Sequence, residues 1–251
     1  APAMVTAERV ATFGTPALVD IYENMFLEDF QQEYECAWVD EATAWISWEL
    51  IQQNQSPEHL WWHAKSTSEA LALVPQILEA IKARRCEAAL AGGIDVGRQR
   101  DLTEFMVVGK GTTAQLPLRL SVSLDRVPFD QQQACFEALI RQLPFTQVLV
   151  DQNGLGMQLA EALAKTGKAK GVDFTNASKE VWAVEARIQF ERGNAPIPLD
   201  RDLAYQIHSI KKTVTAAKNN VFDTEGNEKH HADKFWALAL AYSAAGISRA
   251  S

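Results

Sequence analysis

The strongest structural signal in the chain is the sequence Leu90-Ala91-Gly92-Gly93-Ile94-Asp95-Val96-Gly97-Arg98-Gln99-Arg100-Asp101. An apolar run leads into one carboxylate, Asp95, and a turn with glycine and arginine separates it from a second, Asp101. The apolar residues 105–108 then indicate a returning strand. A carboxylate inside a buried strand is costly unless cations or hydrogen-bond donors compensate it. Asp95 is therefore either the cap of the following turn or a site residue, and this stretch alone leaves both open.

The composition is that of a globular chain with one large domain or two smaller ones. Its 251 residues are 47% hydrophobic and 22% charged, which suits a protein with a packed core. The longest uncharged apolar run, 236–247, is too short to cross a bilayer, and the N-terminus lacks the pattern of a secretory signal. Three scattered cysteines without a CxxC pair are typical of reduced thiols. We therefore expect a cytoplasmic protein.

The net charge of −8 is unevenly distributed. Residues 1–88 carry 5 Lys or Arg against 14 Asp or Glu, whereas residues 89–251 carry 19 against 18. A nearly neutral module can still present a basic face to phosphates. The acidic total therefore does not exclude DNA as a partner.

The hydrophobic periodicity changes near residue 89. Before it, helical patterns predominate. After it, the pattern predicts strands at 88–96, 104–111, 116–125, 147–151 and 170–174, helices at 129–143, 155–165, 178–191, 200–208 and 232–245, and a polar hairpin at 211–215 and 220–223. This order predicts an α/β chain of the ribonuclease-H-like fold. Its mixed sheet would have its first three strands antiparallel and helices on both faces, and a mainly helical N-terminal segment would precede it.

Three acids lie at the ends of elements that this fold would bring together. Asp95 is in the first strand, Asp151 ends the fourth, and Asp233 begins the last helix. Converging carboxylates repel one another, and two divalent cations about 3.5–4 Å apart relieve this in two-metal phosphodiester hydrolysis. The three acids therefore indicate a metal-dependent nuclease site.

Other sites are weaker matches to the sequence. His230, His231 and Asp233 could begin a zinc site, but no second His or Cys cluster completes it. No Gly-x-Ser-x-Gly elbow indicates a serine hydrolase. The segment 107–112 has the composition of a phosphate-binding loop but the wrong spacing, so the sequence predicts no P-loop.

Several segments resemble the nuclease domain of phage terminase large subunits. Its three acidic motifs are matched by Gly-Ile-Asp-Val-Gly at 93–97, Val-Leu-Val-Asp-Gln-Asn-Gly-Leu-Gly at 148–156 and His-Ala-Asp-Lys-Phe-Trp-Ala-Leu-Ala-Leu-Ala at 231–241. The segments 197–203 and 207–212 resemble Mu-like prophage members, and 30–36 resembles the junction that follows the terminase ATPase domain. The resemblance covers about residues 25–245, and its most specific part is the Asp-x-x-Trp-Ala run.

This resemblance implies a DNA-packaging nuclease that cuts concatemeric double-stranded viral DNA endonucleolytically with two Mg²⁺ or Mn²⁺ ions. Matched residue by residue, Asp95, Asp151 and Asp233 are the catalytic metal ligands. Asp101 matches a further acid that some members carry after the first motif, although the turn here is short. The implied partners are DNA, the terminase small subunit and the portal protein, and the implied location is the host cytoplasm.

Full-length members of the resembled family also carry an ATPase domain. The chain begins at Ala1 without Met, so we expect a C-terminal fragment that does not hydrolyse ATP for packaging by itself. Residues 1–88 would then be a helical segment or linker after that ATPase domain, and residues 89–251 the nuclease domain.

Five cations are candidates for holding DNA phosphates. Arg98 and Arg100 lie on the turn after Asp95, and Lys211, Lys212 and Lys218 lie on or beside the expected hairpin before the last acidic motif. In this fold both loops would surround the acidic pocket. The alternative is that they are ordinary solvated surface charges.

Two other functions remain open at this stage. The domain could be a catalytically silent module that docks the motor on DNA, portal or capsid, although the intact acids disfavour this. It could also be a resolvase-like or transposase-like nuclease on the same fold. The helical front part and the motif around Asp233 fit those enzymes less well.

Overall fold

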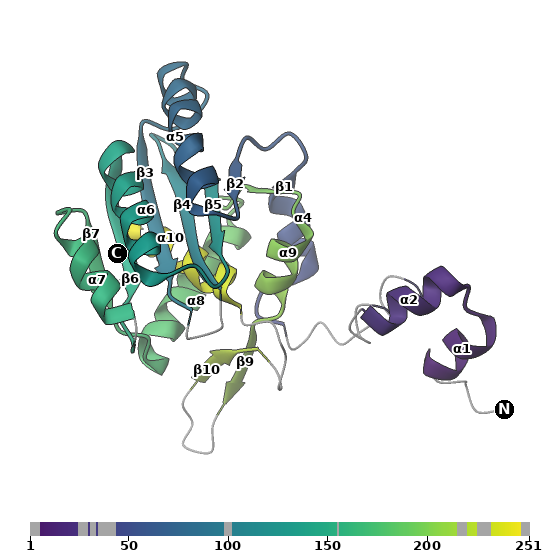
Figure 1. Ribbon diagram of the computed structural model, residues 1–251. Coiled ribbons are helices and arrows are strands. Elements are labelled where there is room, and N and C mark those ends of the chain that lie inside the picture. Colours follow the sequence, from purple (N-terminus) through teal and green to yellow (C-terminus); the bar gives the residue numbers. More distant parts are fainter. Residues whose placement is uncertain are drawn as a thin grey trace. The chain divides into compact units, whose positions relative to one another are not determined.

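The computed structural model describes residues 6–24, 30, 34, 44–97, 102–154, 156–214, 220–224 and 232–246 (Figure 1). The chain divides into two compact units, Ala1–Thr43 and Ala44–Ser251. This division differs from the expected boundary between residues 88 and 89. Residues 44–88 instead add two helices and two strands to the second unit.

The described residues of the first unit form two short helices, α1 (Thr6–Phe13) and α2 (Pro16–Asn24). The Thr15 hydroxyl accepts a hydrogen bond from the Leu18 N–H at 3.2 Å, at the start of α2. A side-chain acceptor at this position satisfies one of the backbone donors that a helix start leaves unpaired.

A six-stranded mixed sheet forms the centre of the second unit (Figure 1). Its order is β2-β5-β4-β3-β6-β7, with β2 at Trp62–Ala64, β3 at Ala89–Asp95, β4 at Thr103–Lys110, β5 at Leu118–Leu124, β6 at Phe145–Asp151 and β7 at Ala169–Val172. Strands β3, β4 and β5 are antiparallel neighbours, and β6 and β7 run parallel to β3. The predicted mixed sheet is therefore confirmed. The unexpected edge strand β2, parallel to β5, has only three residues and so shows no periodicity.

Helices cover both faces of this sheet (Figure 1). One face packs against α5 (Thr67–Lys82), α6 (Phe129–Gln142) and α7 (Gly156–Ala164), and the other against α4 (Trp48–Asn54), α8 (Asn176–Glu191), α9 (Arg201–His208) and α10 (Asp233–Ala244). The first core lies between the sheet and α5–α7, and the second core lies between the sheet and α4 and α8–α10. Side chains of β3 alternate between them, since Leu90 and Ile94 belong to the first core and Ala91 to the second. No helix in the described segments is long and apolar enough to span a bilayer.

Two small sheets join distant parts of the second unit. Strand β1 (Gln55–Ser56) pairs in parallel with β8 (Ile197–Pro198), and β9 (Lys211–Val214) forms an antiparallel hairpin with β10 (Asn220–Asp223). The expected polar hairpin is therefore present.

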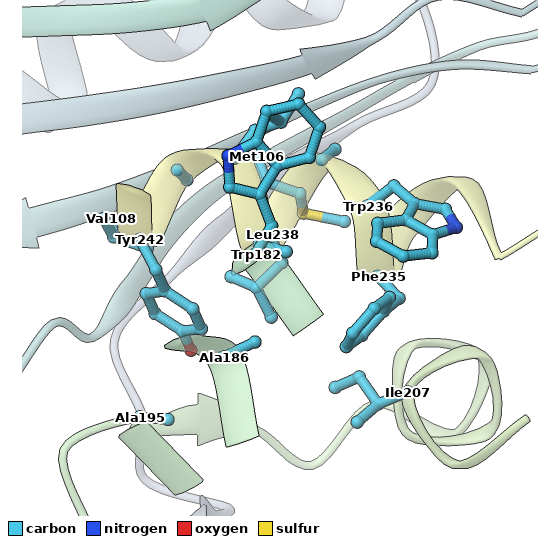
Figure 2. Close-up of a cluster of buried hydrophobic side chains, with 14 of the residues drawn as sticks. Met106, Val108, Trp182, Ala186, Ala195, Ile207, Phe235, Trp236, Leu238 and Tyr242 are labelled. Atoms are coloured by element: carbon cyan, nitrogen blue, oxygen red, sulfur yellow. The ribbon is translucent and has the colours of Figure 1, made fainter. Parts of the chain in front are cut away.

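Helix α10 lies inside the second core and not on the surface. Ten of its 12 residues are buried, and Figure 2 shows its side chains among Met106 and Val108 of β4 and Trp182 of α8. A Cβ added at Gly93 of β3 would collide with the backbone of α10 at Ala237 and Ala241. The absence of a side chain at residue 93 thus lets the helix lie directly against the strand.

Residues 44–54 are integrated into this same core. Ile46 and Ile51 are fully buried. The backbone N–H of Trp45 donates to the Ile210 carbonyl at 2.7 Å, and its indole Nε1 donates to the Ala183 carbonyl at 2.8 Å. These long-range contacts explain why the compact unit begins at residue 44.

Candidate metal centre

The fold places the three predicted acids at one end of the second core. Asp95 is the last residue of β3, Asp151 is the last residue of β6, and Asp233 is the first residue of α10. Strands β3 and β6 are parallel neighbours, and Ile94 pairs with Val150. The two strand-end acids therefore follow directly on paired positions.

The strand-end acids also face the side of the sheet that carries α10. Ala91 of β3 and Leu149 of β6 belong to the core beneath this helix. Side chains on a strand alternate, so Asp95 and Asp151, at even spacings from these residues, share their face. The acid at the start of α10 lies on the same side.

Asp95 is largely buried among negative charges. Burial is the main cause that raises its pKa well above the usual range, and the neighbouring charges of Asp233, Asp151 and Glu104 add to the effect. Lys179 acts in the opposite direction. Asp151 is itself only 8% exposed, and its Oδ1 accepts a hydrogen bond from the Asn153 N–H at 2.9 Å. The structure thus brings the three acids into one electrostatic neighbourhood.

Glu104 is a fourth acid in this neighbourhood, which the sequence reasoning missed. It lies on β4 directly opposite Asp95 and is fully buried. Its Oε2 accepts a hydrogen bond from the Ser123 hydroxyl at 2.8 Å, while its buried Oε1 has no hydrogen-bond partner within the described parts of the chain. Burial raises the pKa of Glu104 to about 8, although the positive charge of Lys234 opposes the rise. Only the register of the β3–β4 hairpin could have indicated its position.

Lys179, on α8, is the cation that influences Asp95. Its Nζ lies 4.7 Å from the ring centroid of Trp236 and 3.7 Å from Asp223 Oδ2 on β10. The Asp-x-x-Trp spacing therefore places an aromatic ring near the start of α10, and Lys179 lies over this ring. Sequence reasoning did not select Lys179, because nothing local distinguishes it from other helix-surface lysines.

The predicted DNA-contacting cations divide into two groups. Lys211 and Lys212 lie on β9, where Lys212 is exposed with its Nζ 5.7 Å from the Trp45 ring centroid and 5.9 Å from that of Phe222. Arg98, Arg100 and Lys218, together with the predicted metal ligand Asp101, lie outside the described residues.

The chemistry of these side chains suits a hard divalent cation. Carboxylate oxygens are the donors that Mg²⁺ and Mn²⁺ prefer. Burial first, and then the nearby acids, raise the pKa of Asp95, and a cation would offset both effects. In the segments that the structure describes, no group of three or more His, Cys, Asp or Glu side chains is already placed to hold a metal ion. The residues therefore fit the metal by donor type and electrostatics, without a complete ligand cage.

A mixed sheet with three leading antiparallel strands, and acids at two strand ends and at the start of the last helix, defines a ribonuclease-H-like domain. A family model described as the terminase RNaseH-like domain matches residues 92–245, more than half of the chain. The chain belongs to this family and is a nuclease domain of the large subunit of a viral DNA-packaging terminase.

Solved structures agree with this family. The large terminase nuclease from the thermophilic phage G20c, solved with bound magnesium, is 25% identical, with a TM-score of 0.54 over 62% of this chain and 80% of that chain. The nuclease domain of the Thermus phage P74-26 large terminase is 23% identical, with a TM-score of 0.52 over 62% and 78%. The HK97 bacteriophage large terminase shares the fold at 10% identity, with a TM-score of 0.56 over 80% of this chain and 43% of that chain. Among curated protein sequences there was no match.

Proposed function

We propose that this domain is a metal-dependent endodeoxyribonuclease that cuts concatemeric viral DNA during packaging. The observation that carries the proposal is the placement of Asp95 and Asp151 at the ends of two paired parallel strands, with Asp233 at the start of the helix packed on their face. Burial, and then the charges of Asp233 and Asp151, raise the pKa of Asp95. Bound magnesium and bound cobalt in the G20c nuclease structures, at 25% identity, support a divalent cation in this family.

In this proposal Asp95, Asp151 and Asp233 hold two Mg²⁺ or Mn²⁺ ions, with Asp101 as a further ligand. When bound, the metal would lower the pKa of an attacking water and stabilise the leaving oxygen of the phosphodiester. The Asn153 N–H keeps Asp151 oriented by its hydrogen bond to Oδ1. Asp95 and Asp151 are the last residues of two sheet strands. Side chains carried by strands are positioned more precisely than side chains carried by loops, as a metal site requires.

The proposed substrate is double-stranded DNA, held by phosphate contacts from Arg98, Arg100, Lys211, Lys212 and Lys218. In the assembled motor the domain would act with an ATPase domain of the same full-length chain, the terminase small subunit and the portal protein, in the host cytoplasm. Residues 44–251 would be the nuclease unit, because the compact unit begins at Ala44.

Plasmid cleavage by the purified chain tests this proposal. Supercoiled DNA should become nicked and linear with Mn²⁺ or Mg²⁺ and stay intact with EDTA. Asp95→Asn should lower cleavage by more than about 100-fold, since even the loss of residues that support metal ligands costs about 10- to 100-fold. Glu79→Gln, an exposed carboxylate on α5, is the matched control and should cleave normally.

Asp95→Asn should also be at least as stable as the wild type in EDTA, because it removes a buried charge from a cluster of acids. A large loss of thermal stability would mean that Asp95 has a structural role. Binding of DNA without any cleavage would instead indicate a silent docking module. Preference for branched over linear DNA would indicate a resolvase-like enzyme.

A further inference from the structure

Helix α10 begins without a capping side chain of its own. Its N-cap position is Ala232, which makes no side-chain capping hydrogen bond. The first backbone N–H groups of a helix have no partner inside the helix and must find one elsewhere. Here the Lys234 N–H donates to Oε1 of Gln206 on α9 at 2.9 Å, and Gln206 is only 5% exposed. The cap of α10 therefore comes from another helix.

The same part of α9 also holds the side chain of Lys234. Its ammonium group, in a residue only 9% exposed, forms an ion pair with Asp202 Oδ2 at 2.5 Å. Nε2 of Gln206 donates to both carboxylate oxygens of Asp202 at 3.3 Å. Lys234, Asp202 and Gln206 are thus connected to one another by contacts between α9 and the first turn of α10.

Helix α9, which carries Asp202 and Gln206, is itself fixed by a cap, a ring contact and buried side chains. Its N-cap Asp200 accepts a hydrogen bond from the Leu203 N–H at 2.7 Å. At its other end the ring of His208 stacks on Trp48, with centroids 4.3 Å apart. Leu203 and Ile207 are buried in the core between these ends. A side chain held from α9 is therefore held by the body of the domain.

We infer that Gln206 and Asp202 are positioning residues, which set the direction of the Asp233 carboxylate by fixing the first turn of α10. This inference rests on the proposed metal-dependent function. Asp233 is the residue before Lys234, so a change in the path of this turn moves its side chain directly. Metal ligands tolerate only small displacements, and their supporting contacts set affinity as well as orientation.

Mn²⁺ binding measured by isothermal titration calorimetry, without DNA, tests the inference. Gln206→Met keeps the volume of the side chain but removes its acceptor and donors. It should bind Mn²⁺ about 10- to 100-fold more weakly than the wild type, as is usual for the loss of a supporting contact. The control Gln132→Met removes another buried glutamine, whose Nε2 donates to the Val127 carbonyl at 2.8 Å beside α6, and should leave Mn²⁺ affinity unchanged.

Asp202→Ala provides a second, milder variant, because 55% of the Asp202 side chain is exposed and its removal should therefore disturb the fold little. It should weaken Mn²⁺ binding in the same direction, and it decides the question if Gln206→Met does not fold. Equal Mn²⁺ affinity of the wild type and the folded α9 variants would overturn the inference. A wild type that binds no Mn²⁺ would overturn the proposed function itself, so the two failures are distinguishable.

Discussion

Replacing Glu104 with glutamine should remove a pH dependence from the stability of the metal-free protein. Glu104 is fully buried opposite Asp95, and one of its oxygens has no partner among the described residues. Glutamine keeps the shape and an oxygen that can accept from Ser123, but it cannot carry a charge. The variant therefore isolates the cost of ionising this one carboxyl group inside the fold.

The size and sign of the effect follow from the pKa of Glu104. It is about 8 in the folded protein against 4.5 as the ordinary value, so between these pH values the folded state binds more protons than the unfolded state. The free energy of unfolding should then fall as pH rises, by roughly 1.4 kcal/mol per pH unit from this group. From pH 5 to pH 7.5 the wild type should lose about 3 kcal/mol relative to Glu104→Gln.

Urea unfolding in EDTA at pH 5, 6 and 7.5, followed by tryptophan fluorescence, measures this difference. The two proteins should be similar in stability at pH 5 and diverge steadily, with the variant the more stable at pH 7.5. The exposed Glu79→Gln variant controls for the loss of one negative charge. Parallel pH profiles for wild type and Glu104→Gln would refute the reasoning, since they would show that Glu104 titrates as it does in the unfolded chain.

Two further predictions concern DNA binding and packing. Lys211→Ala/Lys212→Ala should weaken binding to all duplex sequences and flatten the dependence of log affinity on log salt by roughly one to two units, at about 0.9 per phosphate contact. A fluorescence anisotropy titration at several salt concentrations tests this, with the exposed pair Lys82→Ala/Arg85→Ala as control, and an unchanged slope would contradict it. Gly93→Ala should destabilise the fold by about 3 kcal/mol or more, because the new methyl group would strike the α10 backbone. Gly111→Ala, whose nearest neighbour would be the Glu87 side chain at 3.3 Å, should cost much less in the same urea unfolding experiment.

Much of the sheet could be predicted from the sequence because its strands are long enough to show their period. Strands β3 to β6, with seven or eight residues each, lie within or near the predicted ranges. Strand β2 could not be found, because its three residues pair with β5, which comes much later in the chain. The start of the compact unit at Ala44 was missed for a related reason. The unit begins there because Trp45 forms hydrogen bonds with Ile210 and Ala183, and the local sequence gives no sign of contacts with residues so distant in the chain.

The positions of the acids could be predicted only where the order of the helices and strands determines them. Asp95, Asp151 and Asp233 stand at the ends of elements, and the topology of the fold brings those ends together. Glu104 could be placed only through the β3–β4 register, in which it pairs with Asp95. The contact from Gln206 to the backbone of Lys234 links two helices far apart in sequence, so no local pattern signals it.

One helix–strand contact accounts for the meeting of Asp95 and Asp233. A side chain at Gly93 would strike the backbone at Ala237, so these two positions are neighbours. Two residues further along β3 is a step of about 6.6 Å to Asp95 on the same face. Four residues back along α10 is a step of about 6 Å to Asp233, again on the same face. The steps are nearly equal. After burial, the charge of Asp233 is a cause of the raised pKa of Asp95, which agrees with both steps running in the same direction. The spacings Gly-x-Asp and Asp-x-x-x-Ala therefore work together, since the close packing at Gly93 brings both acids to the same place.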